Sequence, residues 1–279
     1  MNSVKWTMFN LHFWSVLMDI GFTVFTCPFM LLPAMAGFPL GLDVTLGVPV
    51  VLAVYVLMTL FTIVGISTVS IFENRFFLLF ASRSSWKFVR YPFLLIDYIL
   101  ALICFIPPLL NIPDQKDAIE ILEKKYRDIP IRIYSEQLFI MSINHLYILI
   151  SMSSISGLII IETFTFGILI SKNLKRNSAT MVLSKNTVKL QKKFMRALII
   201  QILTPVLILF VPASYLVFSI SQYYYSQIAN NLCMFVISLH GCTSTVVMLY
   251  MHEPYRKYCS GWLFRNVHSE ISNVSFFSK

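Results

Sequence analysis

The stretch KNLKRNSATMVLSKNTVKLQKKFMR, Lys172–Arg196, separates two long apolar runs and decides how the rest of the chain is organised. It contains eight Lys and Arg residues and no Asp or Glu. Short loops this basic stay on the cytoplasmic side of a membrane, because moving their charges across the bilayer is costly. The stretch therefore predicts the direction in which the neighbouring helices cross the membrane.

The second half of this loop has the pattern of an amphipathic helix. Helical spacing places its basic residues on one face, and these are Lys185, Lys189, Lys192, Lys193 and Arg196. One interpretation is attachment to anionic lipid head groups, at roughly 1 kcal/mol per charge. The other is the docking of a cytosolic protein, and both interpretations place this basic stripe inside the cell.

The composition excludes an ordinary soluble domain. The chain is 57% hydrophobic and only 13% charged, whereas charged residues make up about a quarter of soluble domains. No Lys, Arg, Asp or Glu occurs from Ala197 to His252, a run long enough for two crossings of about 20 residues each. The net charge of +9 comes from basic residues that cluster in loops between apolar runs, not along a soluble surface. No nucleic-acid partner is therefore expected.

The apolar pattern predicts an all-α fold, a single polytopic bundle of six transmembrane helices over residues 1–279. The predicted spans are 8–37, 44–72, 91–111, 138–171, 197–220 and 227–251. With loop 172–196 inside, 17 of the 22 Lys and Arg residues fall on the same side. Both termini, including the tail 252–279, are therefore expected in the cytoplasm.

Polar residues inside the predicted spans require an explanation, because charges are expensive in a bilayer. His12, Ser15 and Asp19 share one helical face, which suits either an ion-binding pocket or an interhelical hydrogen bond. His240 and Ser244 form a second polar face in the last span, where a packed histidine is favoured over a metal ligand.

Two further acidic residues lie in the predicted spans. Asp97 lies within two turns of the cytoplasmic end of its run and is expected to reach water, whereas the position of Glu162 leaves its role open.

Motifs for catalysis, cofactors and metals are absent from the sequence. There is no HExxH, GxSxG, Walker or GxGxxG pattern, so no enzyme activity is expected. The five cysteines lack CxxC spacing, so neither a metal site nor a disulfide framework is indicated. Cys259, just past the last span, is a candidate for palmitoylation.

Several motifs in chain order resemble the class h serpentine receptors of nematodes, a family of seven-transmembrane chemoreceptors. The resemblance runs from end to end of the chain. The motifs are NLHFWS at Asn10–Ser15 with Asp19, AGFPLG at Ala36–Gly41, ENR at Glu73–Arg75, LQKKF at Leu190–Phe194, HGCTST at His240–Thr245 and HEPYR at His252–Arg256.

The resemblance implies a G-protein-coupled receptor for a small odorant or pheromone-like ligand, in the plasma membrane of sensory neurons and their cilia. Candidates for contact with a heterotrimeric G protein are Glu73, Asn74, Arg75, Lys189, Lys192, Lys193 and Arg196. Candidates for the ligand pocket, chosen by their depth near the outer face, are Phe29, Tyr215 and Tyr224. Such receptors have seven spans, whereas this sequence starts just before the second, so the first span is expected to be lacking.

Two other functions remain alternatives at this stage. A small transporter or channel would be favoured by inverted repeats or paired broken helices, and no internal repeat is evident in the sequence. The other alternative is a membrane protein that does not signal.

Overall fold

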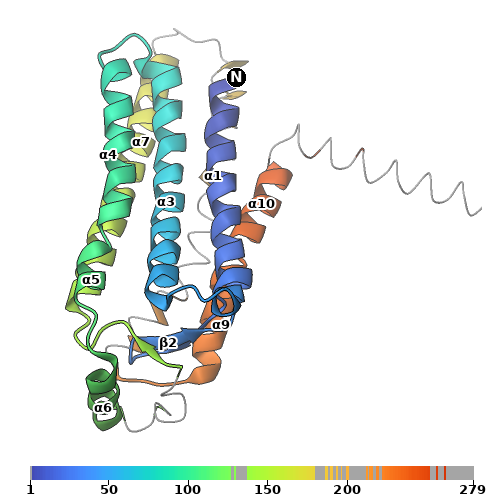
Figure 1. The fold of residues 1–279 in the computed structure, drawn as a ribbon. Coiled ribbons are helices and arrows are strands. Elements are labelled where there is room, and N and C mark those ends of the chain that lie inside the picture. Colours follow the sequence, from blue (N-terminus) through green and yellow to red (C-terminus); the bar gives the residue numbers. More distant parts are fainter. Residues whose placement is uncertain are drawn as a thin grey trace, which may run out of the picture.

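The computed structural model describes residues 2–126, 129, 137–179, 223–251, 256 and 261, and a scattered set between 186 and 222. It is mainly a bundle of long helices, with a small sheet and short helices gathered at one end (Figure 1). The expectation of a mostly helical membrane protein is confirmed, and the sheet is an addition to it.

The first apolar run forms a helix that is shorter than predicted. Helix α1 (Asn2–Ile20) continues into a π-helical turn, η1 (Gly21–Phe25), and the chain then turns at Cys27, whose φ is 41°. The predicted continuation of the helix to residue 37 is wrong. Proline lacks the N–H that a helix requires, and Pro28, Pro33 and Pro39 interrupt this segment.

The residues that follow form a hairpin instead. Strand β1 (Pro28–Leu31) pairs antiparallel with β2 (Ala36–Pro39), and β2 pairs with the short β3 (Phe139–Ile140). A side chain on Gly37 would overlap the carbonyl oxygen of Phe29, so the hairpin requires glycine at this position.

The next two long helices form an antiparallel pair. After the short α2 (Leu42–Thr45), α3 (Val50–Phe76) extends into a second π-helical turn, η2 (Phe77–Ala81). Helix α4 (Trp86–Ile103) leads into the short α5 (Ile106–Leu110). Compared with the predicted spans 44–72 and 91–111, α3 ends later and α4 begins earlier.

A cap closes the end of the bundle that carries the hairpin. Helix α6 (Gln115–Lys125) starts at Asp114, whose carboxylate accepts hydrogen bonds from the backbone N–H groups of Lys116 and Asp117. Leu31, Phe38, Leu122, Tyr126 and Ile140 belong to one buried cluster that joins α6 to the three strands. The predicted loop 112–137 therefore contains a helix that packs against the strands through a shared hydrophobic cluster.

The remaining described helices complete the bundle. Helix α7 (Leu146–Ala179) starts after β3, so the predicted run 138–171 contains a strand, a turn and then a helix. The predicted last span is divided into α9 (Gln227–Ser238) and α10 (His240–Met251). Most of the predicted span 197–220 lies outside the described residues.

Among the described residues, four helical segments are long and apolar enough to cross a membrane: Lys5–Phe25, Val50–Ala81, Trp86–Leu110 and Leu146–Arg176. The start of α1, the turn between α3 and α4, and the end of α7 lie at one end of the bundle (Figure 1). We call this the N-terminal end, and the end with the sheet and α6 the capped end.

Helix α3 is the centre of this arrangement, because it packs against α1, α4 and α7. Outward-facing apolar side chains such as Trp6, Leu110, Ile161 and Phe164 are largely exposed. An exposed apolar surface of this extent suits a lipid environment.

Candidate functional site

A buried ion pair joins α3 to α4 at the N-terminal end of the bundle. Arg90 donates from Nη2 to Oε2 of Glu73 at 2.9 Å, and Trp86 donates from Nε1 to Oε1 of the same carboxylate at 2.7 Å. Trp86 and Arg90 are four residues apart, so they lie on one face of α4 and converge on Glu73. The Glu73 side chain is fully buried, and both of its oxygens are hydrogen-bonded.

The same group of residues reaches two further helices. Arg90 also donates to Oδ1 of Asn74 at 3.1 Å, and Asn74 donates to the hydroxyl of Thr7 in α1 at 3.4 Å. The indole ring of Trp86 contacts Phe166 of α7, with 5.9 Å between ring centroids. We call Thr7, Glu73, Asn74, Trp86 and Arg90 the Glu73 cluster, and it links α1, α3, α4 and α7.

The burial of this cluster corrects one expectation. Glu73 and Asn74 were predicted to contact a G protein, but they are 0% and 1% exposed, so neither presents its side chain to a partner in this structure. Arg75 is half-buried. Sequence analysis did not identify Trp86 or Arg90, although their spacing in the first turns of α4 was a usable signal.

The basic stripe is only partly covered by the structure. Lys189, Lys193 and Arg196 are helical and exposed. Lys185 and Lys192 lie outside the described residues, as does Cys259, the candidate for palmitoylation.

The two predicted polar faces meet between α1 and α10. The Nδ1 atom of His240 lies 3.2 Å from Oδ1 of Asp19, with the His240 side chain buried. A side chain on Gly241 would overlap the Asp19 carboxylate, so this close approach depends on glycine. Asp19 thus lies against a residue of another helix, but its Oδ1 atom and Nδ1 of His240 do not form the hydrogen bond that one interpretation expected.

The other members of these faces are also near or within the core. Ser15 and Ser244 are buried, whereas His12 is half-buried.

A separate polar network in the bundle was missed in the sequence. Asn10 donates to Ser67 at 3.1 Å and to the hydroxyl of Tyr98 at 2.9 Å, and it accepts from the indole of Trp14 at 3.0 Å. The network ties α1 to α3 and α4.

The three ligand-pocket candidates lie towards the capped end, each in a different setting. Phe29 stacks on Phe38 in the hairpin, with 4.9 Å between centroids. Tyr215 donates to Oδ1 of Asn230 at 2.8 Å, and Asn230 in turn donates to the carbonyl oxygens of Met30 and Leu32. Tyr224 is 48% exposed.

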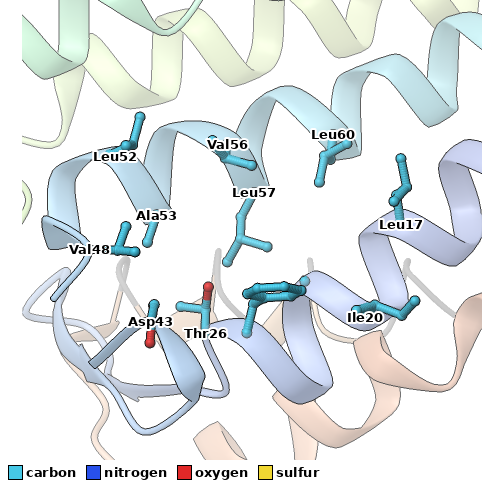
Figure 2. A pocket seen from close by; sticks show the side chains of 12 residues that line it. Leu17, Ile20, Thr26, Asp43, Val48, Leu52, Ala53, Val56, Leu57 and Leu60 are labelled. Atoms are coloured by element: carbon cyan, nitrogen blue, oxygen red, sulfur yellow. The ribbon is translucent and has the colours of Figure 1, made fainter. Parts of the chain in front are cut away.

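A groove of about 390 Å³ lies elsewhere, between α1–η1 and the first half of α3 (Figure 2). Its walls are almost entirely apolar, and the polar residues Thr26 and Asp43 lie at one end. The volume falls within the range of small-molecule sites. The lining residues are Leu17, Ile20, Gly21, Phe25, Thr26, Asp43, Val48, Leu52, Ala53, Val56, Leu57 and Leu60.

No group of three or more His, Cys, Asp or Glu side chains in the described part of the chain is arranged to hold a metal ion. The polar clusters instead connect helices, and the groove offers an apolar surface between two of them.

The comparison with protein families agrees with the motifs found in the sequence. Residues 1–265 match the family described as serpentine type 7TM GPCR chemoreceptor Srh. No curated protein and no solved structure matches the chain. The match covers nearly the whole chain. The protein is therefore a multi-pass membrane protein that belongs to the Srh family of serpentine chemoreceptors.

Proposed function

We propose that the chain senses a small, largely apolar ligand from the capped side and signals through a heterotrimeric G protein at the N-terminal end. The family match is the observation that carries this proposal. The apolar groove beside α3 supports an apolar ligand, since hydrophobic surface dominates the lining of small-molecule sites.

The helix contacts suggest how a ligand could act at a distance. A ligand shifts a conformational equilibrium only by its differential affinity for the two states. The groove is formed by α1 and α3, and both helices also contribute to the Glu73 cluster. Movement of α1 against α3 at the groove would therefore change the spacing within this cluster.

In this proposal the basic stripe contacts the G protein, while the Glu73 cluster sets the positions of the helices. We expect alanine at Lys189, Lys192, Lys193 and Arg196 to leave surface expression close to that of the wild type, because single surface charges contribute little to stability. The agonist response should fall at least several-fold.

The measurement is G-protein activation in cells that express the chain, across a panel of volatile and lipid-soluble compounds. The control carries alanine at the exposed Lys116 and Lys124 of α6, which should leave the response unchanged. Loss of surface expression in the quadruple variant would make the stripe a structural anchor and contradict the docking role.

The proposed orientation places both termini and the N-terminal end of the bundle in the cytoplasm, as the distribution of Lys and Arg favours. Epitope tags at either terminus should be inaccessible to antibody in intact cells. A tag beside Asp117 in α6 should be accessible. Antibody binding to a C-terminal tag in intact cells would reverse the orientation and contradict the docking site.

A further inference from the structure

Two carboxylates in the bundle have no ion-pair partner among the described residues. Asp97 of α4 is 3% exposed, and its Oδ2 atom has no hydrogen-bond partner. Glu162 of α7 is half-buried, and its buried Oε2 atom also has no hydrogen-bond partner. Both residues lie near the middle of segments long enough to cross a membrane, Trp86–Leu110 and Leu146–Arg176. Asp97 was expected to reach water, and this expectation is wrong because α4 begins at Trp86 and places Asp97 deeper.

Neighbouring residues place Asp97 and Glu162 at the same level of α4 and α7. One helical turn towards the N-terminal end, Phe93 of α4 contacts Phe166 of α7, with 5.8 Å between ring centroids. One turn in the other direction, Ala101 and Ile159 share a packed cluster. Because α4 and α7 run in opposite directions (Figure 1), Asp97 and Glu162 occupy the intervening level of both helices.

The described groups around this level do not neutralise the pair. No ion pair with a Lys, Arg or His side chain reaches either carboxylate among the described residues. The facing part of α3 presents Ile63 and Ile66, and the hydroxyl of Tyr98 is engaged with Asn10. The span outside the described residues adds no Lys or Arg, because none occurs from Ala197 to His252.

We propose that Asp97 and Glu162 form a binding site for a small monovalent cation, with Na⁺ as the probe ion. Two uncompensated carboxylates at this depth are strongly unfavourable, so a bound positive charge stabilises the bundle. Carboxylate oxygens are hard ligands suited to alkali and alkaline-earth ions. A divalent ion is disfavoured because Ca²⁺ takes six to eight oxygen ligands and Mg²⁺ sheds its water reluctantly.

The proposal is independent of the proposed signalling function, and so is its test. We expect the purified full chain in lipid nanodiscs at pH 8 to have a Tm about 2–4 °C higher in NaCl than in N-methyl-D-glucamine chloride of equal ionic strength. This difference should disappear in Asp97→Asn and in Glu162→Gln. It should persist in Asp19→Asn, a matched control whose acidic side chain lies against His240.

Protonation competes with the cation, because a neutral carboxyl group no longer attracts Na⁺. The Na⁺-dependent shift should therefore shrink as the pH is lowered and vanish once both groups are protonated. Equal Tm values in the two salts at pH 8 would overturn the proposal. A Tm that depends on pH but not on the identity of the cation would also overturn it, since the pair would then hold only protons.

A direct binding measurement covers the case in which a variant fails to fold. We expect wild-type protein to bind ²²Na⁺ saturably, at about one ion per chain, with loss of binding at low pH. Absence of saturable binding would overturn the proposal even if the variants cannot be purified.

Discussion

Replacing Arg90 with alanine is expected to lower the free energy of unfolding by about 3–5 kcal/mol, because it leaves the buried Glu73 carboxylate without its counter-ion. Glu73 has no exposed side-chain surface, and the 2.9 Å contact with Arg90 supplies the opposite charge. Asn74 would lose its hydrogen bond to the same guanidinium group. The measurement is thermal or denaturant unfolding of the purified protein in detergent.

The matched control for this prediction is Arg83→Ala. Arg83 is exposed in the turn between the same two helices, so its removal should change stability by less than about 0.5 kcal/mol. A second variant separates charge from packing: Glu73→Leu combined with Arg90→Met should recover most of the loss, because it removes both charges. Similar stability of Arg83→Ala and Arg90→Ala would contradict the assignment of a buried ion pair.

The substitution Gly41→Ala is expected to reduce stability by about 3 kcal/mol and to abolish any ligand response. The amide of Gly41 donates to the carbonyl oxygen of Thr26 at 3.0 Å, which brings the end of the hairpin directly against η1. A methyl group there would overlap the backbone of Phe25. Backbone atoms cannot move aside as a flexible side chain can. The expected loss of stability is therefore at the upper end of the range for overpacked cores.

The consequence for function follows from the position of this contact. Phe25 and Thr26 line the groove beside α3, so displacement of η1 changes the shape of the groove. The control is Gly157→Ala in α7, where an added methyl group meets open space and should stabilise the helix by roughly 0.5–1 kcal/mol. Equal unfolding temperatures for the two variants would show that the hairpin adapts to the extra methyl group.

The membrane class and the family could be predicted from the sequence because both depend on composition and on short motifs in a given succession. The absence of charge from Ala197 to His252 excludes a soluble domain whatever the fold is. The motifs NLHFWS, ENR and HGCTST are also local, and the family match over residues 1–265 agrees with them.

The boundaries of the elements were less predictable. Hydropathy alone does not distinguish an apolar helix from an apolar hairpin, so the first predicted span continued to residue 37, through most of the hairpin. The proline positions in that segment contained the missing information. The depth of Asp97 was predicted incorrectly for a related reason. The charged residues at the start of α4 were assigned to a loop, so the predicted span began too late.

The sequence by itself determined that this chain crosses a membrane several times, and that it belongs among serpentine chemoreceptors, since composition and motif order carry that information. Only the tertiary structure decided which polar residues meet: Glu73 with Arg90, and Asp19 with His240. Such pairings depend on how helices distant in sequence rotate and pack against one another. Helix packing is set by many weak apolar contacts acting together, and no single stretch of the chain encodes their sum.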